Sequence, residues 1–424
     1  MFLNNPKQMK IIIITYPVSP FRGSEYSVSW NYITEMSKYH ELFVLYGTSG
    51  NGLGNVSELQ EWLKNNELKN VHFINVQMPK NKLSYFLAFC RKLNYTYGSF
   101  IQYKYWHKFV YQKAKEIITT NNIQIIHYLN PIGFKEPSEC WRIKDIPYIW
   151  GPMKATSNTS FKLYKALSLK GKVSFFMKRI LHNIAFITFP KVRKAIKRAD
   201  FIFSATPETV IMLKKWHHKE SLYLPENGIK KMERNLPIKY DPTNTPLNIV
   251  WIGRLDENKA LIILLDALKK VKSQQWHLHV IGSGELEDKL RRHSMGFSSF
   301  ITWYGNIPRT KVLQLLSTMH LHVITSLSEA TSTVLLEAMS FAIPTITLDH
   351  CGMSAVVCPK CGIKISIQSY KQITEDIAYN IDLIIKKPQI IQSLSEGVLE
   401  CSKKIMWSNR IKIFNDIYNQ IVKR

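Results

Sequence analysis

Two cations mark a turn in the second half of the chain. In IVWIGRLDENKALIILLDAL (residues 249–268), a strand-like apolar run ends at Gly253, and Arg254 and Lys259 come before an apolar helical pattern. A guanidinium that binds in bidentate fashion and a compact ammonium suit a diphosphate. Two solvated surface cations fit the same spacing, so this segment alone leaves both interpretations open.

Two glutamates with seven residues between them stand in SEATSTVLLEAMSF (residues 328–341). Glu329 follows a predicted strand, which places it on a loop at the carboxyl end of that strand. Glu337 lies among apolar residues of the next helix, although carboxylates are rarely buried without a partner. Hydrogen bonds from ligand hydroxyls, such as a ribose diol, would satisfy it. A structural carboxylate bonded to backbone N–H groups or to an arginine is the alternative.

Three small polar residues separate these glutamates. Thr331, Ser332 and Thr333 are N-cap candidates for the predicted helix. The free N–H groups and the positive dipole end of a helix form an anion site. The sequence therefore predicts an anion site beside Glu329.

Glycine turns follow two more predicted strands. VIGSGELEDKL (280–290) contains Gly282, and WYGNIPRTKVLQLL (303–316) contains a turn that ends at Ile307. Glycines let backbone approach a ligand closely, and the second turn offers a surface for a flat base. Each turn alone is weak evidence, since many α/β turns look alike.

Short β-rich runs alternate with helical patterns along the whole chain. This alternation predicts right-handed βαβ units and parallel sheets covered on both faces. Two such series predict an α/β fold of two doubly wound, Rossmann-like domains facing a central cleft, with ligands beyond the carboxyl ends of the strands. The predicted strands are 10–16, 41–46, 71–76, 123–128, 146–150, 200–204, 221–224, 247–252, 276–281, 299–304, 320–325, 344–348 and 362–366.

The domain boundary is predicted from composition. The segment 225–248 is rich in proline, asparagine and charge, as linkers are. We therefore expect a first domain over 1–225 and a second over 226–407. A last helix over 408–424 is expected to return to the first domain.

Several segments together resemble the retaining GT-B enzymes of glycosyltransferase family 4. In the second half these are GRL-x4-K, SEATSTVLLEAMSFAIP and PENGI. In the first half they are SPFRGSEYSVSWN, IIHYLNPIGFKEPS and IPYIWGP. The resemblance covers nearly the whole chain in the expected order, and the two glutamates together with GRL-x4-K are its most specific part.

The resemblance implies a role for each matched residue. Arg254 and Lys259 would neutralise the leaving nucleotide diphosphate, Glu337 would bind the ribose hydroxyls, and Glu329 would hold the transferred sugar. In the first domain, Gly23 and Ser24 would bring backbone N–H groups to the phosphates, and His127 would stand near the anomeric centre or the acceptor. Arg254, Lys259, Glu329 and His127 form the predicted catalytic group. The predicted donor-binding residues are Gly23, Ser24, Gly253, Arg254, Lys259, Gly282, Ile307, Glu329, Thr331, Ser332, Thr333 and Glu337.

This sequence departs from the family pattern at four places. Ala260 replaces a glycine, Ala330-Thr331-Ser332 replaces a glycine-containing turn, and the Gly23 loop has one glycine rather than two. The family often has His-x-His where this chain has His127-Tyr128-Leu129. A satisfied core histidine is therefore the alternative for His127.

The charge is strongly positive and unevenly spread. The chain has a formal net charge of +26. Residues 1–225 hold 32 Lys/Arg and 13 Asp/Glu, and the remainder hold 25 and 18. The acid-free stretches 68–115 and 146–199 mix basic with large apolar residues, which suits an anionic membrane surface. A solvated basic face remains an alternative, and nucleic acid is not expected as a partner because no motif for it accompanies the charge.

Cysteine usage and the start of the chain bear on its location. The apolar run near residue 11 is short and ends before a proline, so it predicts a strand and not a signal peptide. No apolar run reaches the roughly 20 residues of a membrane helix. We expect a cytoplasmic protein, peripheral on the inner face of the membrane, with its six cysteines as free thiols. Cys358 and Cys361, with His350 and Cys351 upstream, form a lone CxxC that is only weak evidence for zinc.

These patterns predict a retaining glycosyltransferase of the hexosyltransferase type. It would move a sugar from a nucleotide diphosphate sugar to a saccharide or lipid-linked saccharide, in surface polysaccharide biosynthesis. No metal and no other cofactor is expected, because two cations can replace Mg²⁺ and no Asp-x-Asp follows a strand. The alternatives are a GT-B enzyme related to phosphorylases or epimerases, and a non-catalytic protein that binds sugars or polyanions.

Overall fold

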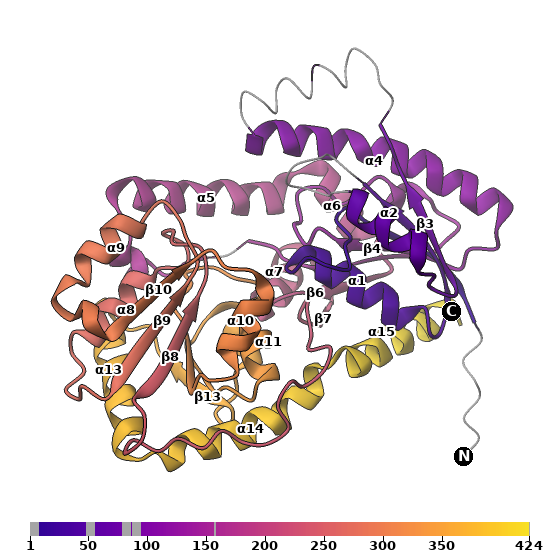
Figure 1. Ribbon diagram of the computed structural model, residues 1–424. Helices are drawn as coiled ribbons and strands as arrows, with labels where there is room; N and C mark the ends of the chain where they lie inside the picture. Colours follow the sequence, from indigo (N-terminus) through magenta and orange to yellow (C-terminus); the bar gives the residue numbers. More distant parts are fainter. Residues whose placement is uncertain (1–7, 48–55, 79–85, 87–94, 157, 424) are drawn as a thin grey trace. The chain divides into compact units, whose positions relative to one another are not determined.

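The computed structural model describes residues 8–47, 56–78, 86, 95–156 and 158–423. Cys90 and part of the basic stretch 68–115 lie outside these residues. The chain divides into two compact units (Figure 1), which are described one at a time. No helix among the described residues is long and apolar enough to cross a membrane.

The first unit is built on a seven-stranded parallel sheet. It comprises Met1–Ala155, Ile184–Asn227 and Trp407–Arg424. The strand order is β3-β2-β1-β4-β5-β6-β7. The strands are β1 (Lys10–Thr15), β2 (Glu41–Tyr46), β3 (Val71–Asn75), β4 (Ile125–Asn130), β5 (Tyr148–Met153), β6 (Phe201–Ser204) and β7 (Leu222–Tyr223). The helices that cover this sheet are α1 (Glu25–Met36), α2 (Val56–Asn65), α4 (Tyr95–Thr120), α6 (Pro190–Arg198), α7 (Pro207–His217) and α15 (Trp407–Val422).

The last helix completes the core of the first unit. Trp407, Ile411, Phe414 and Tyr418 of α15 are buried in one apolar cluster with α1 and the strands. Their spacing of three or four residues puts them on one face of the helix. The contacts therefore place this helix in the first unit, as the sequence predicted.

The second unit is built on a six-stranded parallel sheet. It comprises Thr156–Asn183 and Gly228–Met406. The strand order is β10-β9-β8-β11-β12-β13. The strands are β8 (Leu247–Ile252), β9 (Trp276–Ile281), β10 (Ile301–Gly305), β11 (Leu321–Ile324), β12 (Thr345–Leu348) and β13 (Gly362–Ile365). The helices are α8 (Leu261–Leu268), α9 (Glu287–His293), α10 (Arg309–Leu316), α11 (Thr333–Ser340), α12 (Cys351–Val356), α13 (Tyr370–Lys386) and α14 (Gln389–Ile405).

Every strand that the sequence predicted is present, and the α/β fold of two doubly wound domains is confirmed. The division of the chain differs at one segment. The predicted first domain included residues 156–183, whereas the contacts group them with the second unit. The physical reason is apolar burial, since Leu163 and Leu167 belong to the core of the second sheet.

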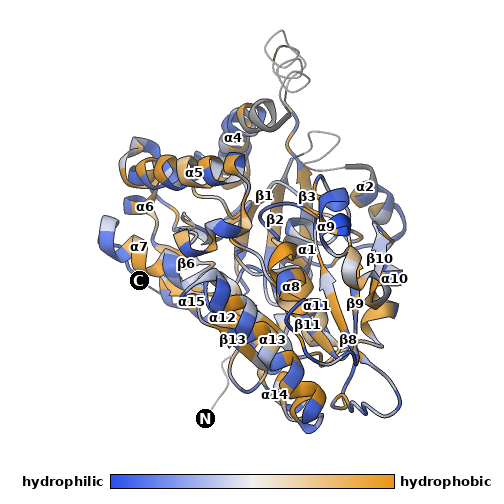
Figure 2. Cartoon of the chain, turned by 90° about the vertical axis from the view of Figure 1, so that its left-hand side faces the viewer, coloured by the Kyte–Doolittle hydropathy of each residue, from blue (hydrophilic) through white to orange (hydrophobic). Residues whose placement is uncertain are grey.

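A long helix, α5 (Leu169–Thr188), begins within this segment and ends in the first unit. It carries basic residues and large apolar side chains that are exposed to solvent. Figure 2 shows both hydrophobic and hydrophilic residues along it. This surface is the structural counterpart of the acid-free stretch 146–199.

Candidate functional site

Three glycine turns lie side by side at the carboxyl edge of the second sheet. A Cβ added at Gly282, after β9, would lie 1.9 Å from the carbonyl oxygen of Gly253, after β8. The Gly282 N–H donates to the Gly305 carbonyl at 2.8 Å. Gly282 and Gly305 also have positive φ values of 130° and 64°. Only glycine allows the backbones of these turns to lie this close together and to adopt positive φ angles easily. Because no side chain stands in the way, a ligand at this edge could contact the backbone directly.

Lys259 and Glu329 meet at this edge. The Nζ of Lys259 donates to Oε1 of Glu329, and the side chains are 19% and 18% exposed. The two elements are fixed to each other by backbone, because the Leu327 N–H donates to the Asn258 carbonyl at 2.7 Å. The structure thus joins the predicted diphosphate cation to the predicted sugar-side carboxylate.

Arg254 is positioned differently from Lys259. Its side chain is 78% exposed and pairs with Oδ2 of Asp256 at 2.9 Å. The other oxygen of Asp256 accepts the N–H of Lys259 at 2.9 Å. Asp256 therefore holds the turn that carries both cations. Asp256 was not predicted as a site residue, although it lies two residues after Arg254.

Ala260 explains one departure from the family pattern. It is the N-cap of α8 and adopts φ 47° and ψ 45°, in the left-handed region. That conformation costs an alanine roughly 1–2 kcal/mol, and glycine almost nothing. The glycine usual at this position is thus a backbone requirement of the turn, which this chain meets at a cost.

Glu337 has an arginine partner that the sequence did not reveal. Oε1 of Glu337 accepts from Nε of Arg309 at 3.0 Å and lies 2.8 Å from Nη2. Among the described residues, no hydrogen bond reaches Oε2 of Glu337. Burial raises the pKa of this carboxyl, and the Arg309 guanidinium opposes the rise. The partner is 28 residues away in sequence, on a different helix, so no local signal could have found it.

The first turn of α11 lies next to Glu329. Ser332 is its N-cap, and Thr331 and Ser332 are buried. The Ser332 side chain makes no capping hydrogen bond, and the first backbone bond of the helix joins the Leu336 N–H to the Ser332 carbonyl at 3.4 Å. Of the three predicted N-cap candidates, Ser332 holds the position, while Thr333 begins the helix.

The Ala330 turn is closed from one side by α12. A Cβ added at Gly352 would lie 1.9 Å from the Ala330 carbonyl oxygen. The backbone of this turn is therefore tightly packed although it lacks the glycine of the family pattern. Ile307, on the neighbouring turn after β10, is half-buried against the core of the unit.

Gly23 and Ser24 lie in the first unit, in the turn between β1 and α1. A Cβ added at Gly23 would meet nothing within 4 Å. Ser24 is the exposed N-cap of α1, with φ 56° and ψ −138°. The turn is braced by Arg22, which donates to both oxygens of Glu58 on α2 at 2.9 Å. The backbone N–H groups predicted to bind phosphate thus belong to a solvent-facing turn.

His127 is a core histidine, which corrects its predicted place beside the anomeric centre. It is fully buried in β4, with Nδ1 bonded to the Tyr418 hydroxyl and Nε2 2.5 Å from the Gly151 carbonyl oxygen. Burial lowers the pKa of the imidazole to about 4, although the bond to Gly151 acts in the opposite direction. A neutral ring with both nitrogens engaged cannot exchange protons with a substrate.

Part of the second unit matches a known family. Residues 246–382 match the family described as Glycosyl transferases group 1. The chain is 33% identical over 110 residues to the lipopolysaccharide 1,6-galactosyltransferase of Salmonella typhimurium, covering 24% of this chain and 30% of that protein. The matched region spans less than half the length of the curated relatives.

Solved structures resemble the whole chain. The lipopolysaccharide outer core galactosyltransferase WaaB in its apo form is 17% identical, with a TM-score of 0.64 over 96% of this chain and 98% of WaaB. Anabaena HepE in complex with UDP and glucose is 15% identical, with a TM-score of 0.62 over 97% of this chain and 99% of HepE. These similarities confirm the GT-B fold. Together with the family match, they confirm the recognition of a GT-B glycosyltransferase pattern in the sequence.

Proposed function

We propose that this GT-B chain, whose second unit matches the Glycosyl transferases group 1, is a glycosyltransferase that moves a sugar from a nucleotide diphosphate sugar to a saccharide acceptor with retention. One observation carries the proposal. Lys259 and Glu329, from the loops after β8 and β11, form an ion pair at the carboxyl edge of the sheet. A diphosphate cation and a sugar-side carboxylate thus share one location, where ligands of such sheets bind.

Departure of the nucleotide diphosphate is the step that needs most help. Lys259, Arg254 and the N-terminus of α11 supply positive charge where negative charge develops in the transition state. When the diphosphate binds, Lys259 exchanges part of its contact with Glu329 for a phosphate oxygen. Glu329 is then available to accept hydrogen bonds from the hydroxyls of the sugar. The ion pair therefore keeps two functional groups ready for a ligand.

The nucleoside is held by neighbouring groups. The unbonded Oε2 of Glu337 accepts from ribose hydroxyls, while the Arg309 guanidinium opposes the rise that burial gives to the pKa of this carboxyl. The turn at Ile307 lies after β10, the third strand from β11 in the order of the sheet, and offers a surface for the base. HepE is named in complex with UDP, so UDP-sugars are the first donors to test.

The transfer step is proposed to need no divalent metal. Lys259 and Arg254 neutralise the diphosphate in the place that Mg²⁺ takes in other enzymes. The rate is measured after exhaustive desalting, with and without added Mg²⁺ or Mn²⁺. An equal rate supports the proposal, and a rate that appears only with added metal overturns it.

The experiment for the main proposal combines binding with turnover. Thermal unfolding is followed with UDP-, GDP-, ADP- and dTDP-sugars, since a ligand that binds only the native state raises its stability. Lys259→Met should abolish the shift, and Lys371→Met, at an exposed lysine of α13 paired with Glu375, should keep it. Transfer of the sugar with its anomeric configuration retained is then shown by NMR.

The alternatives give different results in the same experiment. A relative of the phosphorylases or epimerases would turn over a donor with free phosphate or without an acceptor. A non-catalytic binding protein would give the thermal shift without turnover, and Glu329→Ala would leave its function intact. Either result would overturn the proposed transfer.

The acceptor is proposed to be lipid-linked, on the cytoplasmic face of a membrane. The supporting observation is an exposed apolar stripe on α5 at helical spacing, with Lys170, Lys172, Lys178 and Arg179 nearby. Basic side chains at headgroups and apolar ones below them are typical of helices that lie on anionic membranes. The stripe consists of Leu169, Val173, Phe176, Met177, Ile180, Leu181 and Ile184.

Vesicle binding tests this part of the proposal separately. The protein should bind vesicles that contain anionic lipid at physiological salt and should bind neutral vesicles much less. Val173→Glu with Leu181→Glu should abolish the binding. Ile211→Glu is the control, because Ile211 is 63% exposed on α7 and does not belong to the stripe. Equal binding by the two variants would refute a membrane role for α5.

A further inference from the structure

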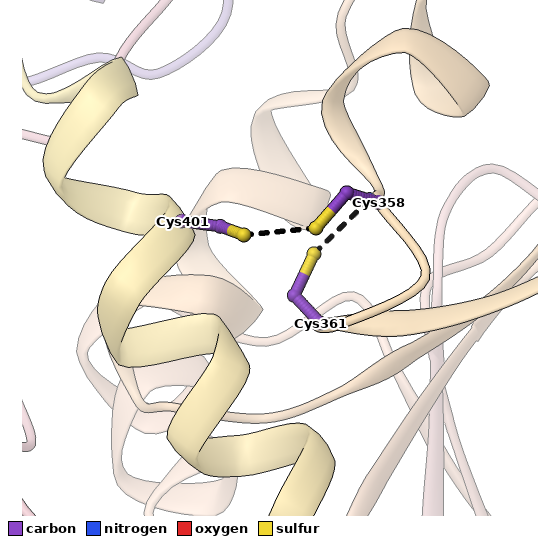
Figure 3. Close-up of side chains that lie close together, drawn as sticks. All are labelled: Cys358, Cys361 and Cys401. Carbon is purple, nitrogen blue, oxygen red and sulfur yellow. Dashed lines mark hydrogen bonds between the residues drawn. The ribbon is translucent and has the colours of Figure 1, made fainter.

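Three cysteines of the second unit converge although they are distant in sequence. Cys358 and Cys361 lie in the loop between α12 and β13, and Cys401 lies near the end of α14. Their sulfur atoms all lie within 4.8 Å of one another (Figure 3). The Sγ atoms of Cys358 and Cys401 are 2.8 Å apart, which is too long for a disulfide. In a tetrahedral zinc site with bonds of about 2.3 Å, two sulfurs are separated by roughly 3.8 Å, so the Cys358 and Cys401 sulfurs would have to move apart by about 1 Å to bind one ion.

The loop forms a tight turn that brings the sulfur atoms of Cys358 and Cys361 together. The N–H groups of Cys361 and Gly362 donate to the Cys358 carbonyl at 3.0 and 3.1 Å, which closes a tight turn. The Cys358 N–H donates to the Cys361 sulfur at 3.2 Å. N–H donors directed at sulfur stabilise thiolates, the form that binds metals.

The third cysteine is held against this loop by a close contact of backbones. A Cβ added at Gly397 would lie 1.8 Å from the Lys360 carbonyl oxygen. Gly397 precedes Cys401 by one helical turn, so both lie on the same face of α14. The glycine therefore lets the helix approach the loop until the Cys401 sulfur reaches the other two.

The cluster lies at the edge of an apolar region. Cys361 is buried, and Cys358 and Cys401 are half-buried, beside Val356 and Val398. Such a position excludes most water from the sulfurs and leaves one side open. His350 and Cys351, the upstream residues suggested by the sequence, do not join the group. The His350 Nε2 lies 3.0 Å from the Ser326 carbonyl oxygen, and its Nδ1 lies 3.5 Å from the Cys351 sulfur.

We propose that Cys358, Cys361 and Cys401 bind one Zn²⁺ as three thiolates, with the fourth position open to solvent. Sulfur ligands select a soft or borderline cation, and Zn²⁺ is the one that needs no redox partner. Binding releases the three thiol protons to solvent, and no electron is transferred. The two alternatives for these thiols are an unmetallated packing contact and a disulfide between Cys358 and Cys401.

The proposed zinc site is structural: it stabilises the fold and takes no part in sugar transfer. The loop precedes β13, so it lies at the amino edge of the sheet, whereas the proposed donor site lies at the carboxyl edge. Zinc would fix this loop to α14 near the end of that helix, just before the chain passes at Trp407 into the first unit. The inference does not depend on the proposed function.

The experiment measures metal content and metal-dependent stability of the full chain. Protein purified without chelator, under reducing conditions, should carry about one zinc per chain by elemental analysis. After removal of the metal, Co²⁺ should give the ultraviolet charge-transfer absorption of cobalt–thiolate bonds. Added Zn²⁺ should then raise the thermal midpoint of the apo protein.

Variants separate a built site from adventitious binding. Cys401→Ala, at a half-buried position that tolerates truncation, should lose the zinc, the cobalt absorption and the stabilisation. Cys351→Ala removes a nearby cysteine outside the cluster and should keep all three. Zinc retained by Cys401→Ala, or absent from reduced wild-type protein, would overturn the proposal. A Cys358–Cys401 disulfide in protein that binds no zinc after reduction would overturn it as well.

Discussion

The carboxyl edges of the two sheets differ in chemistry although their topology is the same. β1 and β4 hold the positions in the first sheet that β8 and β11 hold in the second. In the second sheet, the loops after these strands carry Lys259 and Glu329, a partly exposed ion pair. In the first, the residue that the sequence predicted for catalysis is His127, which lies within β4 and is fully buried and bonded on both ring nitrogens.

This difference shows which polar groups can serve a ligand. A partly exposed ion pair is worth about 1 kcal/mol or less, so a phosphate or a hydroxyl can replace one of its contacts at small cost. A buried, neutral hydrogen-bond network loses the full desolvation energy when a partner leaves. The second sheet therefore offers exchangeable charge, while His127 and its partners hold the first sheet to α15.

Loss of the exchangeable cation should have the largest effect. Lys259→Met is expected to lower kcat by roughly 10²–10³-fold, the usual effect of removing one donor at a developing charge. The thermal midpoint should change little because the ion pair is near the surface. Steady-state kinetics and thermal unfolding measure the two effects. A fall in kcat of less than tenfold would show that Lys259 is not an important catalytic cation, and the inferred difference between the two edges would no longer hold.

His127 should show the opposite behaviour, with an effect on stability and none on the rate. Its pKa of about 4 in the folded protein lies below the ordinary 6.5. The unfolded chain therefore binds the proton more strongly, so this group costs stability progressively as the pH falls from 6.5 to 4. The cost reaches on the order of 3 kcal/mol at pH 4.

The variant His127→Gln tests this linkage. Its free energy of unfolding should be lower at pH 7, because buried hydrogen bonds are lost. Between pH 6.5 and 4 it should fall less steeply than that of the wild type, as denaturant titrations at several pH values would show. A kcat unchanged within about twofold is expected from a residue that acts only on folding. A hundredfold fall in kcat with an unchanged pH slope would restore His127 to the catalytic group.

The error over His127 has a simple structural origin. The sequence predicted a strand over 123–128, which put His127 near its carboxyl end. The strand runs from Ile125 to Asn130, so the histidine lies in its middle. A shift of two residues is within the ordinary uncertainty of strand limits. Because of this shift, His127 was predicted at the edge of the sheet, where a ligand could bind, whereas it lies in the core.

Other features were predictable because they are local. Apolar runs identified every strand, and the glycines after β8 and β9 identified the turns at the edge. Partners across the fold were not predictable, since Arg309 reaches Glu337 from another helix and Cys401 lies 40 residues beyond Cys361. Both depend on how helices pack, which no periodicity in one segment records.

The nucleoside end of the second edge should contribute a smaller effect. Glu337→Gln is expected to weaken binding of the nucleotide by roughly tenfold, since hydrogen bonds to a charged group are worth about 1.5–3 kcal/mol. Because burial raises the pKa of this carboxyl, wild-type affinity should begin to fall at a higher pH than for an ordinary glutamate. Calorimetric titration against pH measures both effects.

A matched variant makes that measurement specific. Glu375→Gln changes a more exposed glutamate of α13, paired with Lys270 and Lys371, and should leave affinity and its pH dependence unchanged. If Glu337→Gln binds the nucleotide as the wild type does, Glu337 is a structural partner of Arg309. The second edge would then resemble the first more closely than we infer.

The smallest effect concerns a feature that the two edges share. The helix after the first strand of each sheet begins with a non-glycine N-cap at positive φ, Ser24 with 56° and Ala260 with 47°. Replacement by glycine relieves strain of about 1–2 kcal/mol but increases the entropy of the unfolded chain. Ser24→Gly should therefore stabilise the protein by roughly 1 kcal/mol, which thermal unfolding can detect.

Ala260→Gly should stabilise the protein less than Ser24→Gly does, because Ala260 is buried and its methyl group also contributes packing. Ala267→Gly, inside α8, is the control and should destabilise, since it relieves no strain. Equal destabilisation by all three variants would show that neither turn is strained.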